Sequence, residues 1–123
     1  MPKPIFIIQE HWARAHHFDF RLEKDGVLKS WAVPKGIPDV SGVKRLAIPV
    51  EDHPKDYATF EGNLPEGQYG AGRVEIWETG TYETRTWDAD RIEIDLHGKK
   101  GKIEGSYAMI KTKIGILIFK KKS

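Results

Sequence analysis

Apolar and polar residues alternate along most of this chain, which is the two-residue period of a β-strand. The alternating or short apolar stretches that predict strands are residues 5–8, 18–24, 27–33, 45–50, 57–60, 73–78, 82–86, 91–96, 102–110 and 114–119. No segment keeps the 3.6-residue period of a helix, and residues 11–16 are expected to form at most a short helical turn. The pattern therefore predicts an all-β protein.

The turn residues between these stretches predict how the strands connect. Asp25-Gly26 separates two alternating stretches, which is a strong signal for a tight hairpin. Gly80 and the region of Lys113 are expected to form further tight turns, and residues 34–42 a long surface loop. Pro49 lies inside a predicted strand and cannot donate a ladder hydrogen bond, so that strand is expected at an edge or at a bulge. Many short strands in so small a chain favour a closed or nearly closed β-barrel, with short helical turns, because closure removes exposed edges.

Length and composition narrow the class of protein. The 123 residues suit a single domain over residues 1–123, and the absence of cysteine excludes disulfides, cysteine-based zinc sites and a thiol nucleophile. No apolar run approaches the roughly 20 residues of a membrane helix, and the first residues lack a signal-peptide core, so we expect a cytoplasmic protein without a membrane partner. The net charge of +2 is small, but eight lysines follow Gly98. They suit either a solvated sheet edge or a flank that faces phosphate.

The most informative polar residues lie on one predicted strand. Strand alternation places His17, Asp19 and Arg21 on one face and Phe18 and Phe20 on the other, where the core is expected. Imidazole and carboxylate are ligands for Mn²⁺ or Zn²⁺, and a guanidinium binds phosphate oxygens bidentately. The row therefore indicates a metal and phosphate site. A solvated strand face with one Asp–Arg pair remains the alternative.

A second polar group, Glu51-Asp52-His53, directly follows a predicted strand and is stopped by Pro54. Two acids and a histidine at a strand end suit metal ligands on a rigid support. The alternative is that one of the acids merely caps a turn. His11 is a third histidine close to acidic residues, which favours the metal interpretation.

Two further segments carry weaker signals. Lys35, presented from a loop, could join Arg21 and Arg45 in neutralising a phosphate, although each separately is an ordinary surface charge. The glycine-rich residues 65–72 lack the Gly-Lys-Ser/Thr ending and the following helix of a phosphate-binding P-loop. Their glycines are expected to serve tight turns and close packing.

Taken in order, these motifs resemble the 3′-phosphoesterase domain family of bacterial ligase D, including its stand-alone archaeal and bacterial type. The resemblance rests on His11 followed by HFDFRLE at 17–23, LKSWAVPKG at 28–36, KRLA at 44–47, EDHPKDY at 51–57 and FEGNLPEGQYGAG at 60–72. It covers nearly the whole chain. Trp12 is a departure, since the family usually has aspartate there.

The resemblance implies a small β-barrel with an active-site groove and an activity on nucleic-acid 3′ ends. The implied reaction uses Mn²⁺, with Co²⁺ or Zn²⁺ as other suitable ions. A phosphodiesterase step removes a terminal ribonucleoside and leaves a 3′-phosphate, and a phosphomonoesterase step then leaves a 3′-hydroxyl. The expected protein is a monomer whose partners, besides nucleic acid, are separate ligase and polymerase proteins.

The resemblance also implies roles for single residues. It implies the metal ligands His11, Asp19 and His53, the catalytic or phosphate-contacting residues His17, Arg21, Lys35, Tyr57 and Arg45, and the supporting residues Glu51 and Asp52. The choice of His11 over His17 as a ligand comes from the resemblance, because alternation supports only the face of His17, Asp19 and Arg21. His17 is then the candidate general acid or base, since the ordinary pKa of histidine lies near neutral pH.

Three alternatives remain open. A non-catalytic barrel could hold single-stranded nucleic acid through Trp12, Trp87, Tyr69 and the lysine-rich C-terminal part, with affinity that needs no metal and with no turnover. A different metal-dependent barrel enzyme could act on a small phosphate or sugar. A catalytically inactive family member could serve as a structural partner of a ligase or polymerase.

Overall fold

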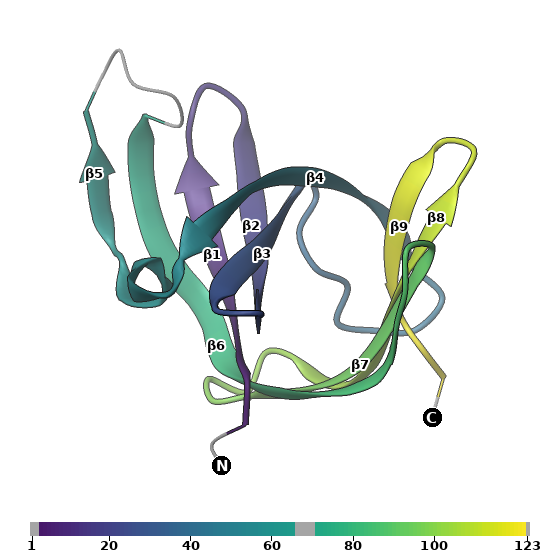
Figure 1. The fold of residues 1–123 in the computed structure, drawn as a ribbon. Coiled ribbons are helices and arrows are strands. Elements are labelled where there is room, and N and C mark those ends of the chain that lie inside the picture. Colours follow the sequence, from purple (N-terminus) through teal and green to yellow (C-terminus); the bar gives the residue numbers. More distant parts are fainter. Residues whose placement is uncertain (1–2, 66–70, 123) are drawn as a thin grey trace.

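The alternating segments pair into one antiparallel sheet that closes on itself (Figure 1). The protein is seen here in a computed structural model that describes residues 3–65 and 71–122. Its strands are β1 Ile5–Trp12, β2 His16–Lys24, β3 Val27–Val33, β4 Lys44–Pro54, β5 Gly62–Leu64, β6 Gly72–Trp87, β7 Arg91–Gly98, β8 Glu104–Thr112 and β9 Gly115–Lys120, and a 3-10 helix, η1 Lys55–Thr59, follows β4.

The strand order is β1-β2-β3-β4-β9-β8-β7-β6-β5, and an additional pairing of β1 with β6 closes the barrel. Within the described residues the closed ring therefore holds every strand except the short β5, which adds to one end of β6. The predicted all-β barrel is confirmed. Closure also leaves few free strand edges.

Two predicted turns are confirmed. Asp25 and Gly26 both have positive φ, 53° and 83°, between the paired residues Lys24 and Val27, as a type I′ hairpin turn requires. Lys113 lies in the turn that joins β8 to β9. The expectation for Pro49 is also confirmed, because β4 pairs with β9 only through Ala47 and the rest of the strand pairs with β3 alone.

The prediction of a turn at Gly80 was wrong. Strand β6 runs through this residue, which pairs with Phe6 of β1 on one side and with Gly98 of β7 on the other. A Cβ atom at Gly80 would lie 1.9 Å from the carbonyl oxygen of His97. The glycine is therefore needed for close approach of two backbones inside a strand, and the turn signal was misleading.

Two further local predictions were wrong. Residues 57–60 were expected as a strand, but Tyr57 belongs to η1, and a side chain from β1 holds this segment: Gln9 Nε2 donates to the carbonyl oxygens of Tyr57 and Phe60, both at 3.2 Å. Residues 11–16 were expected as at most a helical turn, but Trp12 pairs with His16 across the β1–β2 hairpin. A long-range contact from Gln9 thus determines the first segment, and hairpin pairing of β1 with β2 determines the second.

The main core fills the barrel. It contains Phe6, Ile8, Phe20, Leu22, Trp31, Val33, Ile37, Ala47, Tyr82, Ile94, Leu96, Ile103, Tyr107, Met109 and Ile118. Residues 34–42 were expected as a surface loop, yet Ile37 is only 4% exposed and the Tyr107 hydroxyl donates to the Pro38 carbonyl over 2.6 Å, so this loop packs over one end of the core. Burying one large apolar side chain contributes about 1.5–3 kcal/mol.

A smaller apolar cluster lies on the outer face of the sheet. Ile7, Leu28 and Ala58 form it, with Tyr57 packed against them. Through this cluster, η1 packs against strands β1 and β3. The polar face of β2 is consequently covered by η1 and not left in open solvent. Among the described residues, no helix has the length and apolar character needed to cross a membrane.

Candidate metal and phosphate site

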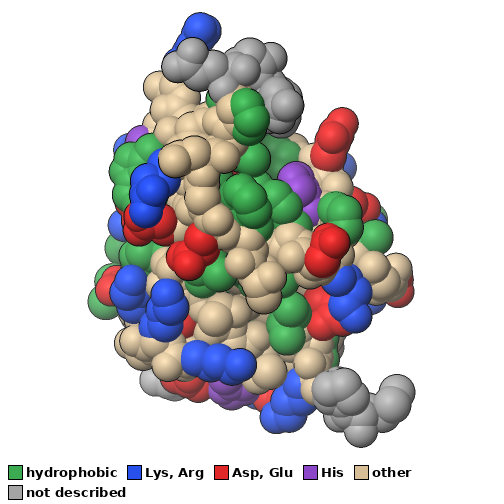
Figure 2. Space-filling model, turned by 90° about the vertical axis from the view of Figure 1, so that its left-hand side faces the viewer, with side chains coloured by type: hydrophobic (Ala, Val, Ile, Leu, Met, Phe, Trp, Pro, Cys, Tyr) green, Lys and Arg blue, Asp and Glu red, His purple; other side chains and the backbone are tan. Residues whose placement is uncertain are grey.

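A cavity of about 330 Å³ lies between the β1–β2 hairpin, strands β3 and β4, and η1. Figure 2 shows the face of the molecule on that side, where apolar side chains surround a histidine. The predicted residues that line the cavity are His11, His17, Asp19, Arg21, Glu51, His53 and Tyr57. Residues from four separate segments of the chain thus meet in one place.

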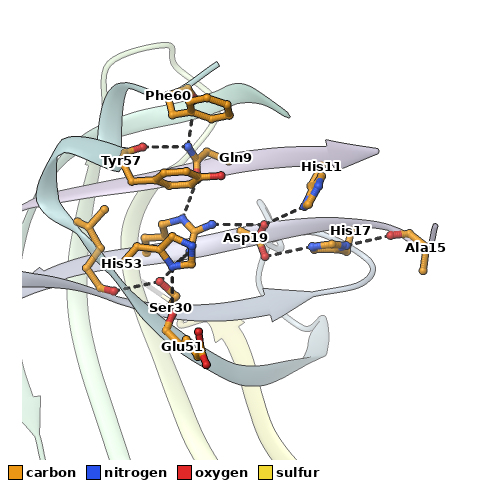
Figure 3. A network of polar contacts seen from close by, with 12 residues as sticks. Gln9, His11, Ala15, His17, Asp19, Ser30, Glu51, His53, Tyr57 and Phe60 are labelled. Carbon is orange, nitrogen blue, oxygen red and sulfur yellow. Dashed lines mark hydrogen bonds and ion pairs between the residues drawn. The ribbon is translucent and has the colours of Figure 1, made fainter. Parts of the chain in front are cut away.

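Three of these side chains form a cluster that could hold a metal ion. Donor atoms of His11, His17 and Asp19 all lie within 4.8 Å of one another. The cluster arises because His11 pairs with His17 across the hairpin, while Asp19 lies two residues along β2 on the same face. Asp19 Oδ1 is 3.1 Å from His17 Nε2, and Oδ2 is 3.4 Å from His11 Nδ1 (Figure 3). Two imidazoles and one carboxylate suit a divalent transition metal such as Mn²⁺ or Zn²⁺.

The His17 ring is oriented by a backbone contact. Its Nδ1 lies 2.9 Å from the carbonyl oxygen of Ala15 and donates to it, which directs Nε2 toward Asp19. Histidines that ligate metals are commonly held in this way through their other ring nitrogen. The hydrogen bond to Asp19 raises the pKa of His17, and burial opposes this only in part.

The Asp19 carboxylate stays ionised despite its burial. Burial acts to raise its pKa, but the hydrogen bond from His17 and the positive charge of Arg21 outweigh it, so the pKa of Asp19 lies below its ordinary value. An ionised carboxylate is the form that binds a metal. His11 is 5% exposed, and its Nε2 has no hydrogen-bond partner among the described residues. Such a buried, unsatisfied nitrogen is costly, and it is expected where a ring is held for a ligand.

The guanidinium of Arg21 places a fixed positive charge beside the cluster. Its side chain is almost fully buried, with Nε donating to Gln9 Oε1 at 2.7 Å and Nη1 donating to Ser30 Oγ at 2.8 Å. Nη2 lies 3.5 Å from Asp19 Oδ2, and the Tyr57 ring packs over the guanidinium at 5.0 Å. The charge is thus paired and hydrogen-bonded on several sides, as a buried charge must be.

His53 lies on the other side of Asp19 from His11 and His17 (Figure 3). Its Nδ1 is 3.2 Å from Arg21 Nη1 and 3.1 Å from the Glu51 carbonyl oxygen. If Nδ1 accepts from Arg21, Nε2 carries the proton; if Nδ1 donates to Glu51, Nε2 has a free lone pair. Burial and the charge of Arg21 lower the pKa of His53, which favours the neutral ring at pH 7.

Tyr57 completes the cavity beside His53. The two rings lie 4.7 Å apart, and Tyr57 stacks on Phe60 with a centroid distance of 5.0 Å. Burial raises the pKa of Tyr57, so its hydroxyl remains protonated and can donate a hydrogen bond. A neutral imidazole and a phenol thus face the same space as the guanidinium.

Three predicted residues do not line the cavity. Lys35 is exposed, and its carbonyl oxygen accepts from Arg45 Nη1 at 2.9 Å. Arg45 also donates to the Gly36 carbonyl, so its guanidinium holds the loop after β3. Asp52 forms an ion pair with Lys29 at 2.9 Å. The roles in phosphate binding and support that were expected for Lys35, Arg45 and Asp52 stay predictions.

Two residues that contribute to the site were missed in the sequence. Gln9 is fully buried and joins Arg21 to η1, and Ser30 pairs directly with Arg21 across β2 and β3. Alternation could have found Gln9, because it precedes His11 by two residues and shares its face. Residues 66–70 of the glycine-rich segment, Tyr69 among them, lie outside the described residues.

Comparison with known proteins shows the family to which the chain is related. Residues 9–111 match the model of a family described as the DNA ligase D 3′-phosphoesterase domain, and this stretch contains all of the predicted site residues. The chain is 57% identical over 111 residues to the multifunctional non-homologous end joining protein LigD of Mycobacterium bovis, covering 87% of this chain and 14% of that protein.

Two further relatives carry the same name. The LigD of Mycolicibacterium smegmatis is 46% identical over 119 residues, covering 88% of this chain and 15% of that protein. The LigD of Pseudomonas aeruginosa is 46% identical over 114 residues, covering 89% of this chain and 13% of that protein. The chain therefore spans only a small part of the length of the relatives that it matches.

Proposed function

The chain belongs to the family of DNA ligase D 3′-phosphoesterase domains, and from this premise we propose that it is a metal-dependent phosphoesterase acting on the 3′ ends of nucleic acids. The observation that carries the proposal is the buried cluster of His11, His17 and Asp19, with the Arg21 guanidinium beside it in the same cavity. The names of the relatives support a role in non-homologous end joining.

The ion would be held by His11, Asp19 and one further imidazole. Distance favours His17 as the third ligand, whereas the resemblance favours His53. Nitrogen and carboxylate donors suit Mn²⁺, with Co²⁺ and Zn²⁺ as other candidates. A bound divalent ion supplies a Lewis acid for a phosphate oxygen.

The protein side chains would divide the remaining work. Arg21 binds phosphate oxygens with a charge that Gln9 and Ser30 hold in place. Whichever of His17 and His53 is not a ligand serves as the general acid or base, and the hydroxyl of Tyr57 donates to the phosphate. Lys35, exposed on its loop, is available to another phosphate of the same strand.

The proposed substrate is a strand that ends in a ribonucleotide. Hydrolysis of the last phosphodiester releases the terminal nucleoside and leaves a 3′-phosphate, and hydrolysis of that monoester releases phosphate and leaves a 3′-hydroxyl. The nucleophile of the first step is water or, where the penultimate nucleotide is also a ribonucleotide, its 2′-hydroxyl, which displaces the terminal nucleoside to give a 2′,3′-cyclic phosphate that water then opens. The resulting 3′-hydroxyl suits a ligase, and a ligase and a polymerase are the proposed partners of this domain.

A 5′-labelled primer–template ending in one ribonucleotide tests this proposal. We expect loss of the nucleoside and then of the phosphate with Mn²⁺, and neither product with a chelator. His11→Ala and Asp19→Asn should abolish both steps, while His97→Ala, on a partly buried histidine of β7 that does not line the cavity, should retain them. Binding of the strand without any turnover in Mn²⁺ would instead identify the non-catalytic single-strand-binding barrel and overturn the proposal.

A further inference from the structure

A second cavity, of about 270 Å³, opens at one end of the barrel interior. Its apolar lining comes from Trp31, Trp87, Ile92, Met109 and Ile116. We refer to it as the barrel-mouth pocket. Trp31 and Met109 belong to the main core, so the pocket is an opening into that core and has a rigid floor.

The barrel-mouth pocket lies on the opposite face of β3 from the proposed catalytic cavity. Lys29 and Trp31 line the barrel-mouth pocket, whereas Ala32 lines the catalytic cavity, because successive side chains of a strand point to opposite faces. The two cavities share no lining residue. The barrel-mouth pocket therefore has no part in the metal and phosphate chemistry described above.

Two indole rings give this pocket an aromatic wall. The Trp31 and Trp87 centroids are 6.4 Å apart with an interplanar angle of 56°, so the rings form a corner. Lys24 Nζ lies 4.7 Å from the Trp87 ring centroid and so places a cation against this ring, although Lys24 does not itself line the pocket. Aromatic faces with a nearby cation are the usual contacts for the base and backbone of an unpaired nucleotide.

Cations also surround the opening. Lys29, Arg91 and Lys111 line it, and the side chain of Lys111 is exposed. The ion pair of Lys29 with Asp52 joins two partly exposed side chains and is therefore weak. Two acids, Asp88 and Asp90, also line the pocket, and Asp88 Oδ1 accepts backbone N–H groups of its own turn at 2.9 and 3.0 Å. Arg91 Nη1 donates to Glu93 Oε2 at 2.9 Å and is therefore engaged, so the cations that can turn to a phosphate are Lys29, whose ion pair is weak, and the exposed Lys111.

We propose that the barrel-mouth pocket binds one unpaired nucleotide of a nucleic-acid strand, with the base against Trp31 and Trp87 and a phosphate beside Lys29 and Lys111. The volume lies just below the range of about 300–1,000 Å³ that is typical of small-molecule sites, which suits a single base. The inference goes beyond the proposed function, because binding here requires neither a metal ion nor turnover.

The four tryptophans of the chain provide a direct test. Nitrogen-15 NMR resolves the indole N–H groups, and a short oligothymidylate with a 3′-hydroxyl end is titrated in the presence of a chelator. We expect the signals of Trp31 and Trp87 to shift in a saturable way. Those of Trp12, on the β1–β2 hairpin, and Trp77, packed against Phe18, should stay in place. Unshifted Trp31 and Trp87 signals, with or without a shift of Trp12, would overturn the proposal.

Substitutions give a second readout. Lys111→Glu changes an exposed side chain, and Trp87→Leu removes one aromatic wall; each should weaken binding of the oligothymidylate about tenfold. Trp12→Leu is the matched control, since this tryptophan is 39% exposed and lies outside the pocket. Equal affinity of the Lys111→Glu variant and the unchanged protein would refute the inference, even if Trp87→Leu failed to fold.

The two proposals can fail separately. A protein that shows the Trp31 and Trp87 shifts but releases no phosphate with Mn²⁺ would retain the nucleotide pocket and lose the proposed function. A protein that cleaves the ribonucleotide end but shows no shifts would do the reverse.

Discussion

The side-chain oxygen of Gln9 accepts a hydrogen bond from Nε of Arg21 over 2.7 Å. The amide nitrogen of the same Gln9 donates to the carbonyl oxygens of Tyr57 and Phe60. One buried side chain from β1 therefore fixes the guanidinium of β2 and also holds η1, which carries Tyr57, over the cavity. The position of the Arg21 charge, which we propose binds phosphate, depends on a residue that does not itself line the cavity.

We expect Gln9→Leu to lower kcat for 3′-phosphate release about 10- to 100-fold, because Arg21 loses the partner that aims its guanidinium. The free energy of unfolding should fall by about 1–3 kcal/mol, since buried donors and acceptors lose their partners. Steady-state kinetics and urea unfolding measure the two effects. Asn63→Ala, on the exposed side chain of β5, is the control and should change neither. A destabilised variant with unchanged kcat would leave Gln9 a purely structural role.

The second prediction concerns which histidine is the third metal ligand. If His17 joins His11 and Asp19, as their distances suggest, then His17→Ala should weaken Mn²⁺ binding at least tenfold. His53→Ala should then bind Mn²⁺ with nearly unchanged affinity and still lose most of its activity, because His53 lies beside Arg21 and Tyr57. Titration calorimetry with Mn²⁺ measures the affinity without depending on turnover. The opposite ranking of the two variants would support the ligand set implied by the resemblance.

Much of the site could be predicted from strand alternation. The period of two placed His17, Asp19 and Arg21 on one face and Phe20 in the core, and the structure confirms this arrangement. What alternation could not show is that the polar face is covered. The burial of Asp19 and Arg21 results from η1, whose position depends on contacts between segments that are far apart in the sequence.

The errors have a common physical origin. Gly80 and the segment around Tyr57 were interpreted from local patterns alone, and in both cases a contact with a distant strand determines the backbone. At Gly80 the contact is the carbonyl of His97, and at Tyr57 it is the amide of Gln9. The choice between His17 and His53 as a metal ligand also could not be made from the local sequence. It depends on the distances between side chains, which strand pairing sets.

Gly80→Ala should destabilise the barrel strongly. Its new Cβ would meet the carbonyl oxygen of His97 at 1.9 Å and Phe6 at 3.0 Å, so the backbones of β6 and β7 would have to separate. We expect the free energy of unfolding to fall by about 3 kcal/mol or more. Gly26→Ala is the matched control, because φ there is +83° but no atom lies within 4 Å of the new Cβ, and its cost should be about 1–2 kcal/mol from φ alone. Equal losses in urea unfolding would contradict the steric explanation.

We expect Glu78, which lies outside the proposed catalytic cavity, to make the stability of the fold sensitive to acid. This fully buried carboxylate accepts backbone N–H groups of Thr79, Lys100, Lys102 and Ile103 at 2.8 to 3.1 Å, and so holds the turn between β7 and β8. Burial acts to raise its pKa, but these hydrogen bonds outweigh it and the pKa of Glu78 lies below its ordinary value. The ionised form is therefore the one that the fold stabilises.

The sign of the pH dependence follows from this shift. Above the unfolded-state pKa of about 4.3 the contribution of Glu78 is fully present, and it is lost as the pH falls through the lower pKa of the folded state. Glu78→Gln should lower the free energy of unfolding by about 1–3 kcal/mol at pH 7, because the new amide NH₂ faces backbone donors. The difference in free energy of unfolding between the variant and the unchanged protein should narrow as the pH falls below about 4.3, the ordinary pKa of glutamate. Urea unfolding across this range measures the gap. Glu75→Gln, which removes only an exposed ion pair with Arg73, should change stability by less than about 1 kcal/mol. A gap between Glu78→Gln and the unchanged protein that stayed constant with pH would show that the charge of Glu78 does not stabilise the turn.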